Sequence, residues 1–230
     1  MKKGIIIFSI ITTQLFIACT TMPITNDELV EDAWKLMMKR NHKKALKYLD
    51  KAIEQNATKE YVFVLRGIVN GFLKNSKAEF RDYIKALELN PEHAAANFNL
   101  GQWFWVEGEA DSAIVYYNKS LSNKVVKNTS VIFDGTKFPF TPVKDQLIPS
   151  SSKIYHFLGL AYYDKEDYDN ALINFSYSLD NQYYVGEAQY YIGSIYIVKK
   201  NKRMACQALS VAKEQKYEGA EELLKDINCE

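Results

Sequence analysis

The chain has 230 residues, with 29 Lys and Arg against 28 Asp and Glu, and 47% of its residues are hydrophobic. These ordinary globular proportions exclude a disordered or collagen-like chain, and the near-zero net charge argues against nucleic-acid binding, which needs many contacts from Lys and Arg to phosphate. The 16 Tyr and 12 Phe, against only 10 Gly and 5 Pro, favour helices over a β fold with many turns.

Residues 1–18 have the pattern of a signal peptide. Lys2 and Lys3 precede a mostly apolar stretch from Gly4 to Ala18, which is too short and too interrupted to span a membrane. The run that ends Leu15-Phe-Ile-Ala-Cys19 resembles a bacterial lipoprotein signal. That resemblance implies cleavage before Cys19 and lipid chains on Cys19 that hold the protein at a membrane. An ordinary secretory signal is the alternative, and both interpretations predict export.

Small residues recur at a fixed interval after residue 25. Ala33, Gly67, Gly101, Gly159 and Gly193 are 34, 34, 58 and 34 residues apart, and 58 is 34 plus an insertion of 24. Sixteen positions later, at the same intervals, the chain has Leu or an aromatic residue: Leu49, Tyr83, Tyr117, Phe175 and Leu209. A small residue on one helix lets a second helix approach closely, and the large residue fills the remaining space.

The most regular unit reads Tyr155-x-x-Leu158-Gly159-x-x-Tyr162, then Ala171-x-x-x-Phe175. It resembles the tetratricopeptide repeat (TPR), a helix–turn–helix of 34 residues. The resemblance implies an all-α fold, a right-handed superhelix of about five repeats. We expect a tether at 19–25, repeats 1–3 within 26–127 and repeats 4 and 5 within 152–219.

Residues 128–151 interrupt the array. Pro139, Pro142 and Pro149 exclude a continuous helix, and Asp134-Gly135 between two β-prone runs predicts a hairpin. Two roles stay open for this insertion: it contacts a partner or covers the groove, or it is a solvated spacer.

The tail at 220–230 has Leu223, Leu224 and Ile227 at helical spacing, which predicts a capping helix over the last repeat. Cys206 lies early in the preceding helix and Cys229 ends the cap, so an antiparallel pair brings their Cα atoms to about 5–6 Å. If the chain is exported and Cys19 carries lipid, these two are its remaining cysteines. We therefore predict a disulfide, with two unpaired cysteines as the alternative.

The family resemblance also implies a function. TPR superhelices bind extended peptides or partner helices on a concave face lined by the first helix of each repeat. The residues expected on that face are Trp34, Ile68, Phe98, Gln102, Trp105, His156, Leu160, Tyr163 and Tyr190. This set lacks the Lys, Asn and Arg of TPR domains that clamp a chaperone's terminal carboxylate. The alternative is that these side chains pack against neighbouring helices or under the insertion.

We find no arrangement of residues that indicates catalysis. His42, His93 and His156 fall at different offsets in different repeats, and the chain has no His-x-x-x-His pair and no Cys-x-x-Cys. We therefore expect no enzyme, no metal site, no cofactor and no small-molecule substrate.

The sequence thus predicts a lipid-anchored adaptor of the bacterial cell envelope that binds a protein partner through the groove. The outer membrane, on its periplasmic side, is favoured because Thr20 stands where an Asp is linked to inner-membrane retention. The alternatives are a self-associating structural lipoprotein and an accessory subunit of a cell-wall enzyme.

Overall fold

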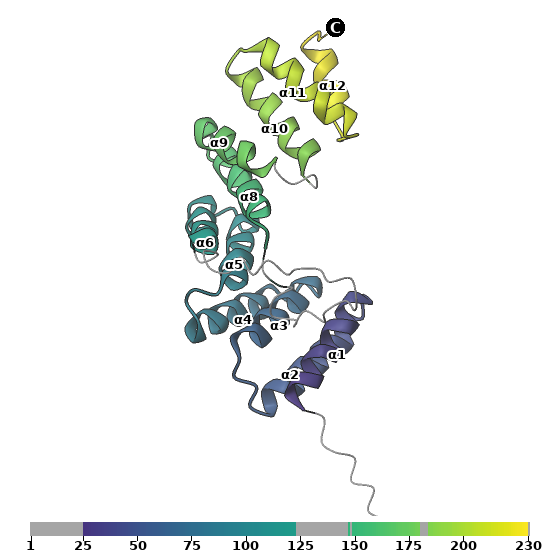
Figure 1. Cartoon of the computed structure of the whole chain (residues 1–230), viewed down its shortest axis with the longest axis vertical. Helices are drawn as coiled ribbons and strands as arrows, with labels where there is room; N and C mark the ends of the chain where they lie inside the picture. Colours follow the sequence, from purple (N-terminus) through teal and green to yellow (C-terminus); the bar gives the residue numbers. More distant parts are fainter. Residues whose placement is uncertain (1–24, 123–146, 148, 180–183, 230) are drawn as a thin grey trace, which may run out of the picture.

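The computed structural model describes residues 25–122, 147, 149–179 and 184–229, and these ranges form helices and turns without a strand (Figure 1). Five helix pairs follow one another, and a short helix ends the chain. The first helices of the pairs are α1 (Asn26–Met38), α3 (Glu60–Phe72), α5 (Ala94–Val106), α8 (Ser151–Asp164) and α10 (Val185–Val198). The second helices are α2 (His42–Glu54), α4 (Ser76–Leu89), α6 (Ala110–Ser122), α9 (Tyr168–Ser178) and α11 (Lys202–Glu214), and the last helix is α12 (Ala220–Asp226).

The glycine and aromatic columns of the sequence meet inside the pairs. A Cβ on Gly67 would lie 2.5 Å from Cε1 of Tyr83, closer than carbon atoms approach. Gly101, Gly159 and Gly193 face Tyr117, Phe175 and Leu209 in the same way. The missing methyl group is therefore what lets the two helices of a pair pack closely.

The turn inside each pair also follows one pattern. The N–H of Asn41 donates to the carbonyl of Leu36 at 2.9 Å, across Arg40, which has a left-handed φ of 58°. This bond satisfies a carbonyl at the end of α1. The equivalent left-handed residues are Lys74, Gly108, Glu166 and Lys200. The next helix then begins with a side-chain cap in three pairs, from Asn41, Asp167 and Asn201.

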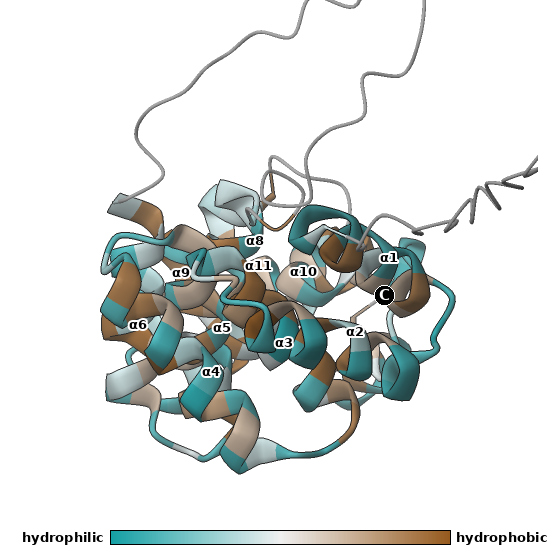
Figure 2. Ribbon diagram, turned by 90° about the horizontal axis from the view of Figure 1, so that it is seen from below, coloured by the Kyte–Doolittle hydropathy of each residue, from teal (hydrophilic) through white to brown (hydrophobic). Residues whose placement is uncertain are grey.

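The pairs stack into a curved superhelix, the fold expected from the sequence. In Figure 1, α5 and α8 lie on the inner side of the curve, and α6 and α9 lie on the outer side. Hydrophobic residues occur in every repeat when the stack is viewed along its length (Figure 2), and the buried side chains fall into several separate clusters. A repeat protein has this distribution because each unit packs only on its neighbours.

The short C-terminal helix covers the last pair. Ala220 and Leu224 of α12 are buried, and the helix ends at Asp226, earlier than the predicted boundary at 230. A left-handed residue, Asn228, follows it, and the N–H of Cys229 donates to the carbonyl of Leu224. The predicted disulfide between Cys206 and Cys229 is present, with Cα atoms 5.7 Å apart.

Two predictions lie outside the described residues: the signal peptide with Cys19, and the hairpin in the insertion. The insertion's described part begins at Leu147, which packs against the clusters formed by α1 to α3 and by α3 to α5. None of the helices in the described ranges combines the length and apolar character of a membrane span.

Candidate protein-binding face

The nine residues predicted to line the groove divide into two groups. Phe98, His156 and Leu160 are buried, with 2%, 1% and 4% of their surface exposed. The other six are partly exposed: Trp34, Ile68, Gln102, Trp105, Tyr163 and Tyr190. The first three are therefore core residues of this structure, which is the alternative that the sequence had left open for them.

Contacts between consecutive repeats explain this burial. The ring of Phe98 packs against Tyr117 and Phe157, with centroids 5.7 and 5.4 Å apart, and the ammonium of Lys153 lies 4.9 Å from its centroid. The ring of His156 stacks on Tyr184 at 4.3 Å.

Nε2 of His156 also lies 3.0 Å from a carboxylate oxygen of Glu187, so His156 joins repeat 4 to α10. Leu160 belongs to a cluster with Phe175 and Ile195. Each of the three buried side chains thus serves the packing between neighbouring helices.

The partly exposed aromatic side chains are held in place from one side. The indole N–H of Trp105 donates to Asp164 at 2.6 Å, and its ring meets Phe157. Tyr163 and Tyr190 both contact Tyr191, with centroids 4.8 and 5.6 Å away. These rings are fixed by their neighbours while part of each remains accessible, a combination that favours protein binding because little side-chain entropy is lost.

The N-terminal half of the face is arranged differently. Trp34 and Ile68 pack against the core cluster of α1 to α3, and Leu147 of the insertion packs on the same cluster. This end of the face is therefore partly covered by the chain itself. The C-terminal half, from Trp105 to Tyr190, keeps its aromatic side chains as part of the surface.

The structure adds an exposed apolar column that the sequence analysis missed. The last residue of four of the five first helices is apolar and largely exposed: Met38 (64%), Phe72 (60%), Val106 (76%) and Val198 (54%). The fifth is Asp164. Their spacing of 34, 34 and 92 residues matches that of the glycine column. The sequence therefore contained this pattern, one position after Trp105 and after the corresponding position of each other repeat.

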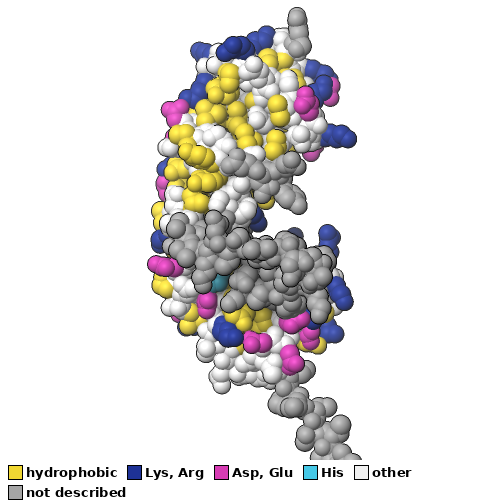
Figure 3. Space-filling view, viewed as in Figure 1, with side chains coloured by type: hydrophobic (Ala, Val, Ile, Leu, Met, Phe, Trp, Pro, Cys, Tyr) yellow, Lys and Arg dark blue, Asp and Glu magenta, His cyan; other side chains and the backbone are white. Residues whose placement is uncertain are grey.

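These residues enlarge the apolar surface along the stack. The space-filling view shows hydrophobic atoms gathered over the upper part of the molecule, around α8 to α11, and a hollow on the inner side of the curve (Figure 3). Exposed apolar side chains recur at this position in three consecutive repeats and again in the last one, and exposed apolar surface of this kind is typical of protein interaction sites.

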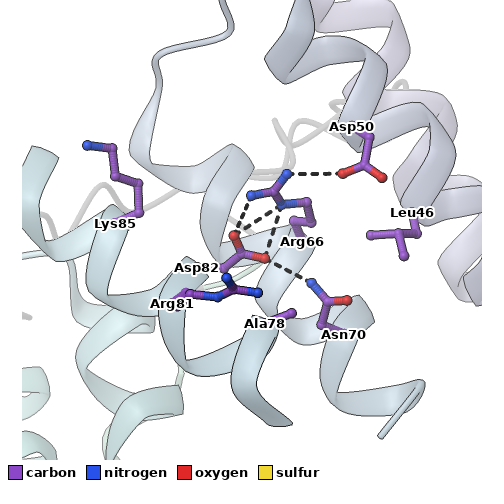
Figure 4. A pocket seen from close by; sticks show the side chains of 8 residues that line it. All are labelled: Leu46, Asp50, Arg66, Asn70, Ala78, Arg81, Asp82 and Lys85. Atoms are coloured by element: carbon purple, nitrogen blue, oxygen red, sulfur yellow. Dashed lines mark hydrogen bonds and ion pairs between the residues drawn. The ribbon is translucent and has the colours of Figure 1, made fainter. Parts of the chain in front are cut away.

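A second, polar feature lies between α2, α3 and α4 (Figure 4). Arg66 donates to both carboxylate oxygens of buried Asp82 at 2.6–3.1 Å and to Asp50 at 3.0 Å, and Asn70 donates to Asp82 at 2.9 Å. These groups line a cavity of about 460 Å³. Arg66 and Asn70 stand where the repeat pattern has apolar residues, and here they satisfy one buried carboxylate, so we interpret the cluster as structural.

Within the described ranges, no group of three His, Cys, Asp or Glu side chains is arranged to hold a metal ion. His42 stacks on Phe72 at 4.5 Å and His93 caps α5, so both have packing or capping roles.

Comparison with known proteins agrees with the repeat pattern. Family models described as tetratricopeptide repeat match residues 81–124 and 152–176. Anaphase-promoting complex subunit 3 of Schizosaccharomyces pombe is 24% identical over 190 residues, which are 76% of this chain and 28% of that protein. The chain thus spans little more than a quarter of that relative.

Solved structures show the same fold. PilW, a widely conserved type IV pilus biogenesis factor, matches with a TM-score of 0.64 and 14% identity over 82% of this chain and 76% of its own. YrrB, a TPR protein with an unusual peptide-binding site, matches with a TM-score of 0.63 and 18% identity over 86% of this chain and 91% of its own.

Proposed function

We propose that this chain of tetratricopeptide repeats is an adaptor that binds a segment of a protein partner on the inner face of its superhelix. One observation carries the proposal: the first helices present fixed, partly exposed aromatic side chains beside an exposed apolar column. The likeness to YrrB, whose structure has a peptide-binding site, supports the same function.

Trp105 offers the sharpest test because the same helix holds a matched control. Replacing Trp105 and Tyr163 together with Ala should weaken partner binding by ~30-fold or more, since an aromatic hot spot contributes ~2 kcal/mol or more. Trp103→Ala should leave binding unchanged, because the indole of Trp103 donates to Ser76 and packs on Phe80, next to α4. Chemical crosslinking and pull-down from membranes identifies the partner and provides the binding assay.

Equal binding by the wild type and the double variant, with helical circular dichroism unchanged, would contradict the proposal. Light scattering on the purified chain provides the second check. A stable dimer whose formation is lost in the Trp105→Ala, Tyr163→Ala variant would assign the face to self-association instead.

We further propose that lipid on Cys19 anchors the adaptor in the bacterial envelope, at the periplasmic side of the outer membrane. The support is the apolar run that ends at Ala18-Cys19 after Lys2 and Lys3. Cys19→Ala should abolish labelling by a fatty-acid analogue and leave a precursor that runs larger on a gel. Label retained in the variant would show that Cys19 is not the acylated residue.

A further inference from the structure

Five tyrosines gather around the N-terminal half of α10, and we call them the tyrosine surface: Tyr163, Tyr184, Tyr190, Tyr191 and Tyr217. We propose that this surface, with the carboxylates of Asp164 and Glu187, binds a basic peptide segment that contains Lys or Arg side chains. The inference rests on the proposed function and names the chemistry of the partner.

The rings come from three parts of the chain; four of them contact one another in sequence, and the ring of Tyr184 stacks on His156. Tyr163 of α8 meets Tyr191 of α10 at 4.8 Å with the rings 68° apart. Tyr190 of α10 meets Tyr217, in the turn before α12, at 5.0 Å. All five residues are partly exposed, so part of each remains accessible to a ligand.

Carboxylates flank these rings. Asp164 is exposed, and the indole N–H of Trp105 fixes its Oδ2 atom. Glu187 is 33% exposed at its side chain and its Oε2 contacts His156. Each carboxylate has two oxygens, and the bonds described here use one oxygen of each, so each retains acceptor capacity toward a ligand.

Burial and nearby carboxylates raise the pKa of four of these tyrosines: Tyr163, Tyr184, Tyr191 and Tyr217. Burial, the largest cause, raises the pKa of Tyr191 to about 12, and electrostatic interactions with Tyr217, Glu187 and Asp164 also raise it. Burial and then Glu187 likewise raise the pKa values of Tyr184 and Tyr217.

Among the described residues, no Lys or Arg is a cause that lowers the pKa of Tyr163, Tyr184, Tyr191 or Tyr217. Tyr61 at the start of α3 provides the contrast: burial raises its pKa, but the ammonium of Lys59 acts in the opposite direction. The cation of α8, Lys153, lies over the ring of Phe98 one repeat away.

A basic segment is the ligand that satisfies this combination. Lys and Arg are attracted to tyrosine ring faces and to carboxylates, whereas an acidic segment would be repelled by Asp164 and Glu187. The N-terminal half of the face does not offer the same site, because Leu147 already packs against its core.

Fluorescence anisotropy on the full chain tests the proposal with three peptides of about ten residues. The three peptides have the same apolar residues and differ at four positions: these are Lys or Arg in the basic peptide, Gln in the neutral peptide and Glu in the acidic peptide. We expect the basic peptide to bind, with an affinity that falls as salt rises from 50 to 500 mM, and the Glu peptide to bind at least ~10-fold more weakly.

Variants locate the site. Asp164→Asn together with Glu187→Gln should weaken binding of the basic peptide by ~10-fold. Tyr190→Leu should weaken it by ~3-fold, whereas Tyr190→Phe keeps the aromatic ring and should keep the affinity. Glu92→Gln, at an exposed carboxylate between α4 and α5, is the matched control and should change nothing. Circular dichroism checks that loss of the bonds to Trp105 and His156 leaves the helices intact.

If all three peptides bind equally, and the Trp105→Ala, Tyr163→Ala variant loses this binding, the proposed function stands and the preference for basic peptides is overturned. Failure of all three peptides to bind, or binding of the basic peptide that the carboxylate variants do not change, would also overturn it. A dimer that excludes the peptide would assign the surface to a second copy of this chain.

Discussion

Gly159 sits where a methyl group has no room. A Cβ there would lie 2.6 Å from Cδ1 and 2.7 Å from Cε1 of Phe175, and Phe175 is fully buried. Gly159→Ala should therefore destabilise the protein by ~1–3 kcal/mol in urea unfolding, although Ala is the better helix former by ~1 kcal/mol.

Two further variants separate overpacking from a general effect of glycine. Gly71→Ala should be nearly neutral, because the nearest atoms belong to the far end of the flexible Glu79 side chain, which can shift. Adding Phe175→Leu to Gly159→Ala should recover part of the loss, since repeat 1 packs Ala33 with Leu49 at the equivalent positions. No loss in Gly159→Ala would show that the ring of Phe175 moves aside freely.

His93 makes stability depend on pH at a single cap. Its Nδ1 accepts a hydrogen bond from the N–H of Ala96 at 3.2 Å, and burial lowers the pKa of His93 below 6.5. The unfolded chain then takes up the proton more readily than the folded one. The stability that His93 contributes is therefore complete above pH 6.5 and is lost as the pH falls from there through the lower folded pKa.

His93→Asn should keep the cap and remove this dependence. The free energy of unfolding of the wild type should fall by ~1 kcal/mol more than that of the variant between pH 7.5 and pH 5. Thermal unfolding followed by circular dichroism at a series of pH values gives both curves. Parallel curves would show that protonation of His93 does not disturb α5.

At the scale of elements, α12 depends on its covalent link. With seven residues it is too short to be stable alone; it packs on α11, and its Ala220 and Leu224 are buried. The bond from Cys206 to Cys229 closes a loop between two residues that are 23 positions apart in the sequence. On the chain-entropy estimate, that closure contributes about 3 kcal/mol.

Replacing both cysteines with Ser should lower stability by about that amount and expose the tail after α11 to protease. Reductant should have the same effect on the wild type and none on the double variant, which serves as its control. Mass spectrometry after alkylation without reductant reports the bond directly, and alkylated thiols at both Cys206 and Cys229 would contradict it.

The repeat positions are predictable because their cause is local. Gly67 meets Tyr83 only 16 residues away, and the same pair recurs at the same spacing, so the columns of the sequence already contain the contact. The link between Cys206 and Cys229 was predictable for the same reason, because two neighbouring antiparallel helices fix their distance.

Residues at the boundary between repeats are harder to predict. Phe98 and Trp105 look alike as aromatic residues on the first-helix face, but Phe98 is covered by Phe157 of the next repeat, whereas Trp105 keeps part of its surface. That outcome depends on the twist between repeats, which no spacing within one repeat specifies. The pairing of Arg66 with Asp82 was missed because only the departure of Arg66 from the repeat pattern was visible.

At the scale of the whole molecule, the repeats form a line in which each unit packs on its neighbours. The two ends of that line differ mechanically. Tension applied to the ends of the chain would pull on α1 and α2 with only packing and hydrogen bonds to resist it, while the Cys206–Cys229 bond makes the C-terminal loop inextensible. Under tension the bond therefore holds together the part of the chain from Cys206 to Cys229, which includes Tyr217, while the other four tyrosines of the tyrosine surface lie outside the bridged loop.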